Sequence, residues 1–318
     1  MTRRLPSAAL LTLVLSLSLI PWAELLFTTG LPCYRDAGRY FIPDKIALAL
    51  SLRSGVFPFW DGSRAAGLPW FADFQTQLLY PLATVFHLFP VGPAITSFAV
   101  LHMLAAALGG FLALAAWRVR AAALGALVFS LSGFCRTSLD TLTTFSAFAW
   151  IPFILLLTLG GPDRWRLISA GLALACLTLA GIPDQVLLAL AGLAILGGWP
   201  LARKIPWVVL GLVPALPQIL QGLEFVARSD RWLTPATGLS ARAGASTIWS
   251  LRLVDLSAWF FARVPRPESV ADYWMSQHWL GSPYLGLTTG LLIAAALATA
   301  TRRPSMRHGY WPALALML

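Results

Sequence analysis

The chain of 318 residues is 58% hydrophobic but only 11% charged, and its mean hydropathy is +0.73. An ordinary soluble domain is about 25% charged, and so few charged side chains could not cover the surface of a soluble protein of this size. The composition excludes a water-soluble globular protein and predicts an all-α, polytopic membrane protein. The net charge of +10 is also typical of nucleic-acid-binding proteins, so the positions of the basic residues decide between these partners.

The first apolar run, residues 5–27, follows two arginines and is long enough to cross a bilayer, which takes about 20 residues. No cleavage site with small residues closes the run, so it predicts an uncleaved helix and not a signal peptide. A polar loop, residues 28–80, comes next. Its aspartates, basic residues and aromatics stand out in a chain otherwise poor in charge.

Further apolar runs follow this loop, and a second long loop, residues 224–283, separates the later ones. We expect spans at residues 94–117, 121–134, 143–159, 167–180, 186–199, 205–223 and 284–300, and the start of another before Leu318. The sequence thus predicts about 8–9 spans in a single transmembrane domain, residues 1–318. Because the chain ends inside an apolar run, we expect it to be the N-terminal part of a longer protein.

Basic residues in alternate connections mark the cytoplasmic side of a membrane protein. Those that fall on the N-terminal side are Arg3, Arg4, Arg118, Arg120, Arg164, Arg166, Arg203, Lys204, Arg302, Arg303 and Arg307. This distribution predicts a multi-pass protein of the cytoplasmic (inner) membrane with a cytoplasmic N-terminus. Both long loops then lie outside, on the periplasmic face. The basic excess is a topology signal, so we expect membrane lipids and no nucleic acid as partners.

The first long loop carries a distinctive set of motifs. They are Gly55-Val-Phe-Pro-Phe-Trp-Asp61, Gly67-Leu-Pro69, Ala72-Asp73-Phe-Gln75 and Leu79-Tyr-Pro81, with Phe129-Ser-Leu-Ser-Gly-Phe134, Ala180-Gly-Ile-Pro-Asp-Gln185, Pro217-Gln218 and Tyr284-Leu-Gly-Leu287 further on. This set resembles YfhO-like bacterial membrane proteins, which are similar to the GT-C superfamily of lipid-linked-sugar glycosyltransferases. Two positions depart from the family pattern: Asp61 stands where Asn is more usual, and Asp184-Gln185 replaces a His-Pro-Gln-like sequence.

The resemblance implies a GT-C-like helical fold whose long external loops carry juxtamembrane helices. It also implies an enzyme that moves a sugar from a polyprenyl-phosphate donor to an envelope glycan, polymer or lipid acceptor. Asp36, in the first external loop, takes the place of the essential aspartate of these enzymes and is expected to act as general base. A single base with direct displacement implies inversion at the anomeric carbon.

The residue types in the loop fit this chemistry. A phosphate leaving group needs cations, and Arg35, Arg39, Lys45 and Arg64 are near Asp36 in the sequence. We expect Trp60, Asp73 and Gln75 to contact the substrate as well. Metal ligands are not assigned and no cofactor is certain, although Asp36, Asp44 and Asp73 could form an oxygen-rich divalent-metal site.

Structural roles compete with each of these assignments. Asp36 could be a solvated carboxylate or an ion-pair partner of Arg35 or Arg39, and Asp73 could cap a helix. Trp60 could anchor the loop at the membrane interface. At the level of function, the alternatives are a transporter or flippase of lipid-linked glycans and a non-catalytic assembly protein. The span interiors are nearly free of charge, which favours the enzyme over the transporter.

Overall fold

A computed structural model describes residues 8–27, 36–63, 67–116, 122–159, 164–195 and 201–228. Within these ranges the regular elements are all helices, and the extended pairing is limited to an isolated antiparallel bridge between Asp61 and Leu68. The predicted all-α class is therefore confirmed for this part of the chain.

The chain divides into two compact units. The first comprises residues 1–131 and 139–226, and the second comprises residues 132–138 and 227–318. Of the second unit the structure describes one short helix, α7 (Gly133–Thr137), and residues 227–228 at the end of α13. The helices and contacts that follow belong to the first unit.

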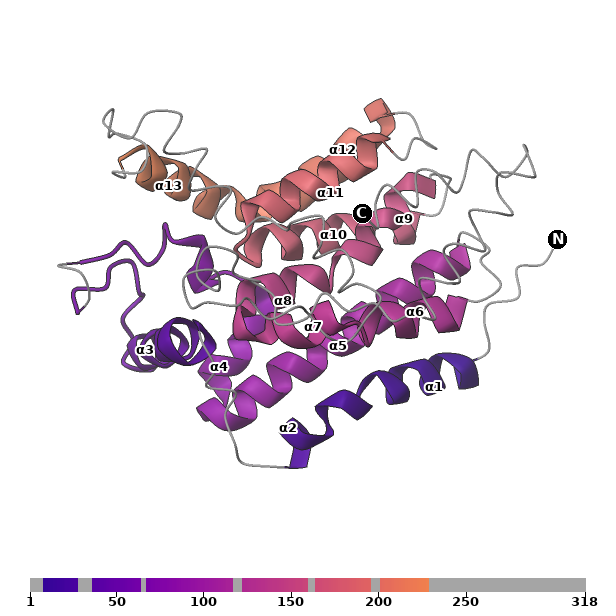
Figure 1. Cartoon of the computed structure of the whole chain (residues 1–318). Coiled ribbons are helices and arrows are strands. Elements are labelled where there is room, and N and C mark those ends of the chain that lie inside the picture. The colour runs from indigo at the N-terminus through magenta and orange to yellow at the C-terminus, as the bar shows by residue number, and fades with distance from the viewer. Residues whose placement is uncertain are drawn as a thin grey trace, which may run out of the picture. The chain divides into compact units, whose positions relative to one another are not determined.

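The helices of the first unit follow one another along the chain, and short turns join several of them (Figure 1). They are α1 (Ala8–Ser18), α2 (Ala23–Phe27), α3 (Ile42–Arg53), α4 (Val85–Leu88), α5 (Val91–Ala116), α6 (Ala122–Ser130), α8 (Leu142–Phe148), α9 (Ile151–Leu159), α10 (Arg164–Leu179), α11 (Pro183–Ile195), α12 (Leu201–Leu212) and α13 (Leu216–Ala227).

Among the described residues, three helical segments are long and apolar enough to cross a membrane: Ala8–Phe27, Val91–Ala116 and Ile205–Ala227. Four other predicted runs form apolar helices of only 10–17 residues within these ranges, so fewer of the 8–9 predicted spans are seen there. The run 143–159 shows one cause: it divides into α8 and α9, and Pro152 in the first turn of α9 cannot donate a helical hydrogen bond. The predicted span 284–300 and most of the loop 224–283 lie outside the described residues, and α13 extends three residues past the expected start of that loop.

Helix α5 is the centre of the first unit, and α1, α6 and α9 pack against it. Gly109 makes the approach of α9 close. A Cβ at Gly109 would lie 2.6 Å from the Phe153 ring of α9, whereas one at Gly110 would make an ordinary contact, 3.4 Å from the Ala126 backbone of α6. Small residues let helix backbones approach closely where lipid supplies no hydrophobic driving force.

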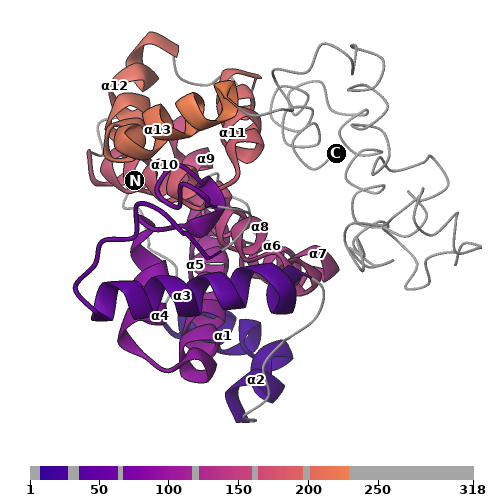
Figure 2. The same ribbon diagram turned by 90° about the vertical axis from the view of Figure 1, so that its left-hand side faces the viewer.

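A second layer forms around α10, which packs against α9, α11 and α12. Here a pair of glycines sets the spacing, because a Cβ at Gly211 of α12 would lie 2.8 Å from the Gly171 carbonyl oxygen of α10. At one end of the unit α3 lies beside α4 (Figures 1 and 2). Between α3 and α4 the structure describes residues 54–63 and 67–84, and this segment runs towards α13 (Figure 1).

Candidate functional site at the first loop

Asp36 is the first described residue of the first loop and lies at the start of a helix. It is exposed, and its side chain caps no backbone N–H. The next five residues, Ala37–Phe41, form a π-helical turn that leads directly into α3. Pro43 in the first turn of α3 cannot donate to the carbonyl of the preceding turn, which favours this wider turn. Single π-turns within helices occur frequently at functional sites.

Two side chains attach this helix to the segment that carries Asp73. Tyr40 donates a hydrogen bond to Asp73 Oδ2 at 2.8 Å, 33 residues further along the chain. One turn later, Lys45 Nζ donates to the carbonyl oxygen of Thr76. These two bonds fix the start of α3, and with it the position of Asp36, relative to residues 73–76.

Asp73 also shapes its own turn. Its Oδ1 accepts a hydrogen bond from the Gln75 N–H at 2.9 Å and caps the short 3-10 turn Phe74–Thr76. The Thr76 hydroxyl donates to the Asp73 carbonyl at 2.7 Å. Gln75 itself is exposed. The capping role that competed with substrate contact for Asp73 is thus present in the structure.

Gln77 ends this turn in the left-handed region, with φ +53°, and its side chain is completely buried. A residue other than glycine is uncommon there and costs free energy that the surroundings must supply. Two hydrogen bonds offset this cost: Gln77 Nε2 donates to Ser146 Oγ at 2.7 Å and to the Ala180 carbonyl at 2.8 Å. The bonds join the first loop to α8 and to the turn between α10 and α11.

Phe74 lies between two glycines from distant parts of the chain. A Cβ at Gly181, where φ is +95°, would lie 2.4 Å from the Phe74 carbonyl oxygen, and one at Gly222 of α13 would lie 2.2 Å from the Phe74 ring. Gln218 Nε2 of α13 adds a hydrogen bond to the Asp73 carbonyl at 3.3 Å. Three of the motif segments quoted above, around residues 73, 181 and 218, therefore meet at one place.

A buried hydrogen-bond chain supports the end of the loop. Trp150 Nε1 donates to the Tyr80 hydroxyl at 2.7 Å, Tyr80 donates to His102 Nε2, and His102 Nδ1 donates to the Phe98 carbonyl at 2.6 Å. The indole is only a donor and the carbonyl only an acceptor, so for a neutral His102 the hydrogen bonds run in one direction, from Trp150 to Phe98. Burial raises the pKa of Tyr80 well above its ordinary value.

The aromatic part of the loop is built around a second turn. Asp61 pairs with Leu68 through two backbone hydrogen bonds, and its Oδ1 accepts hydrogen bonds from the Ser63 N–H and hydroxyl. Trp60 lies against Gly67, where a Cβ would be 2.4 Å from the indole ring. Trp60 is nonetheless 60% exposed, so the contact orients the indole while leaving most of it accessible.

Lys45 differs most from its sequence-based expectation. It is only 1% exposed, and burial lowers the pKa of its ammonium group to about 7, although the carboxylates of Asp44 and Asp73 act in the opposite direction. Its contacts are those of an internal side chain, with Thr76 and, by cation–π attraction, with Phe86 at 5.9 Å. Lys45 thus holds the loop together from inside.

The other predicted residues divide into two groups. Asp36 and Arg39 are exposed on the helix that Tyr40 and Lys45 attach to the loop. Arg35 and Arg64 lie outside the described residues. In the part of the chain that the structure describes, no three His, Cys, Asp or Glu side chains come together in a way that could hold a metal ion. Asp36, Asp44 and Asp73 accordingly do not form a metal-binding cluster there.

Sequence reasoning did not single out Gln77 or Trp150, and it included Tyr80 in the Leu79-Tyr-Pro81 motif without its partners. Their partners lie 22–103 residues away, so no local pattern shows them; the isolated polar residues in apolar surroundings are the available signal. The chain matches no protein-family model, no curated protein and no solved structure. The family resemblance therefore remains a prediction.

Proposed function

We propose that the chain is a membrane glycosyltransferase of the GT-C type, which moves a sugar from a polyprenyl-phosphate donor to an envelope glycan, polymer or lipid on the outer face of the cytoplasmic membrane. The observation that carries this proposal is the convergence of the family-like motif segments on Asp73–Gln77, to which the helix of Asp36 is bonded. An exposed carboxylate on a fixed support is suited to accept a proton from a bound acceptor hydroxyl, which supports the role of general base.

In the proposed reaction Asp36 takes the proton of an acceptor hydroxyl. The acceptor oxygen forms a bond to the anomeric carbon while the bond from that carbon to the phosphate oxygen breaks, and the configuration inverts. Polyprenyl phosphate leaves as an anion. Arg39, which is exposed three residues after Asp36, is suited to stabilise that anion, and so by its residue type is Arg35, which directly precedes Asp36 in the sequence.

The test uses the complete gene in its native host and compares wild type with Asp36→Asn at matched expression. Asp184→Asn is the matched control, because Asp184 is also exposed and also lies in the first turn of a helix. Mass spectrometry reads the envelope glycans and the polyprenyl-phosphate sugars.

We expect Asp36→Asn to lose one sugar decoration and to accumulate its lipid-linked donor, and Asp184→Asn to keep both at wild-type levels. Removal of a general base typically costs 10²–10⁴-fold in rate. If Asp36→Asn retains a decoration that a deletion strain loses, Asp36 is not the base. The transporter and assembly alternatives then take precedence.

A further inference from the structure

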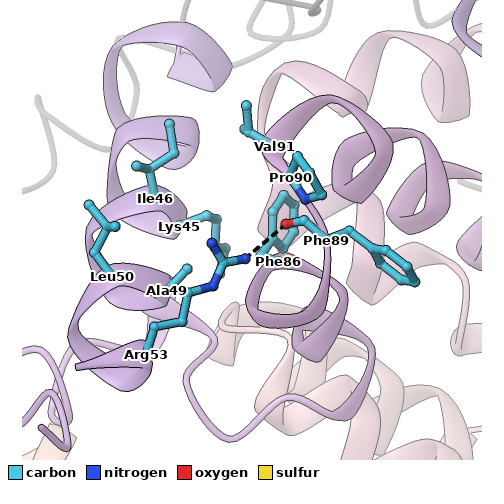
Figure 3. A pocket seen from close by; sticks show the side chains of 9 residues that line it. All are labelled: Lys45, Ile46, Ala49, Leu50, Arg53, Phe86, Phe89, Pro90 and Val91. Atoms are coloured by element: carbon cyan, nitrogen blue, oxygen red, sulfur yellow. Dashed lines mark hydrogen bonds between the residues drawn. The ribbon is translucent and has the colours of Figure 1, made fainter. Parts of the chain in front are cut away.

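A shallow groove separates α3 from the segment that joins α4 to α5 (Figure 3). Its volume is about 170 Å³. Ile46 and Leu50 line it on the α3 side, and Phe86 and Phe89 line it on the other. The walls are mostly apolar, and Arg53, the last residue of α3, extends its guanidinium across the gap to the Phe89 carbonyl.

Arg53 is held in place by backbone carbonyls. Its Nε and Nη2 donate to the His87 carbonyl at 3.3 and 3.2 Å, and Nη2 also donates to the Phe89 carbonyl at 3.3 Å. The Nη1 group takes part in none of these bonds and retains its two N–H donors. The guanidinium is exposed and fixed before any ligand arrives, so ordering it on binding costs little entropy.

The charge of Arg53 is available to a ligand. Its hydrogen-bond acceptors are carbonyl oxygens and not carboxylates within the described ranges. Lys45 also borders the groove, but Asp44 and Asp73 act on it electrostatically. Burial lowers the pKa of the nearby His87 most, and the positive charges of Lys45 and Arg53 lower it further.

The surroundings of the groove are apolar and exposed. Leu50 is 60% exposed, Phe89 45% and Leu88 71%, although α3 and α4 lie outside the three candidate spans. Exposed apolar patches of this kind mark membrane or partner surfaces. A typical pocket for a whole small molecule measures roughly 300–1,000 Å³. The smaller groove suits part of one hydrocarbon chain whose remainder stays in the bilayer.

We propose that this groove binds one anionic diacyl phospholipid, with its phosphate on Arg53 Nη1 and the first carbons of an acyl chain between α3 and Phe86. The phosphate complements the fixed cation, and the chain complements the apolar walls. The site attaches the helix that begins near Asp36 to the membrane surface. It requires no sugar transfer and stands independently of the proposed function.

The experiment measures lipid retention by the purified full chain. Native mass spectrometry compares phosphatidylglycerol with phosphatidylcholine added at equal concentrations to wild type, Arg53→Gln and Arg203→Gln. Arg203 is an exposed cation in the first turn of α12 and does not line the groove, so it is the matched control. We expect wild type and Arg203→Gln to prefer phosphatidylglycerol, and Arg53→Gln to bind it about five-fold more weakly, as expected for one basic residue at an anionic surface.

A groove-filling variant, Ala49→Leu, tests the acyl-chain contact with Arg53 unchanged, and it keeps the proposal testable if Arg53→Gln fails to fold. We expect it to retain less phosphatidylglycerol than wild type. Equal retention by wild type and both groove variants would overturn the proposal. So would displacement of phosphatidylglycerol by an equal amount of polyprenyl phosphate with loss of the Arg53 dependence, since the groove would then serve a prenyl lipid.

Discussion

Gly181 offers a sharp test of how the first loop meets the helices. In Gly181→Ala the new Cβ would lie 2.4 Å from the Phe74 carbonyl oxygen, and the residue would keep φ near +95°. A left-handed backbone costs an L-residue roughly 1–2 kcal/mol. Forcing an extra methyl into a packed site costs a further 1–3 kcal/mol or so. We expect a loss of about 2–5 kcal/mol in the free energy of unfolding.

Two other glycines separate these contributions. Gly55 has φ +77°, but a Cβ added there would have nothing within 4 Å, so Gly55→Ala carries the backbone cost alone. Gly62 has nothing within 4 Å and no left-handed φ, so Gly62→Ala should behave like wild type. The measurement is the thermal unfolding midpoint of each variant in one detergent, followed by circular dichroism at 222 nm.

The expected order of midpoints is Gly62→Ala, then Gly55→Ala, then Gly181→Ala as the least stable. Equal midpoints for Gly55→Ala and Gly181→Ala would show that the Phe74 carbonyl does not press on the turn between α10 and α11. The convergence of the motif segments, on which the proposed function depends, would then lose its main contact.

Three further predictions concern stability. Tyr40→Phe removes the hydrogen bond to the Asp73 carboxylate, and we expect a loss of about 1.5–3 kcal/mol in denaturant titrations; an unchanged midpoint would refute that bond. The folded state lowers the pKa of Lys45 from 10.5 to about 7, so the unfolded chain binds more protons between these values and stability should rise with pH across that window. In Lys45→Met this rise should be smaller, as measured by thermal midpoints from pH 7 to pH 10. Gly109→Ala should lower the free energy of unfolding by about 1–3 kcal/mol, because the new Cβ meets the Phe153 ring. Gly110→Ala is the control and should leave stability unchanged, because its Cβ meets only ordinary contacts. Similar thermal midpoints for the two variants would refute the close approach of α5 and α9.

The helical class could be predicted from the sequence because it depends on a global quantity, the balance of apolar and charged residues. The lengths of the individual membrane spans were harder to predict. The run 143–159 is uniformly apolar, yet Pro152 divides it, since a proline changes the backbone without lowering the hydropathy. Composition counts apolar side chains, and the length of a helix also depends on its hydrogen bonds.

The candidate site shows the same limit at the level of single residues. Lys45 is one of several basic residues in a polar loop, and nothing local shows that its ammonium group points inward to Thr76. Gln77 has partners 69 and 103 residues away. Asp73 was found because it belongs to a motif, but its bond to Tyr40 was not. Contacts between distant segments decide which polar residue is buried, and a single sequence does not record them.

The bonds that hold Asp73–Gln77 also fix the order in which this region can mature during synthesis. Gln218 lies 145 residues after Asp73, and ribosomes add roughly 5–20 residues per second. On the order of 7–30 s therefore pass, with the loop bonded only to segments that precede α13, until α13 emerges to cover Phe74. A chain truncated before α13 would keep Asp36 and the loop sequence but leave the Phe74 ring uncovered. Quality-control proteases could recognise such an incomplete molecule by this exposed ring, and during normal synthesis they have the same long interval in which to do so.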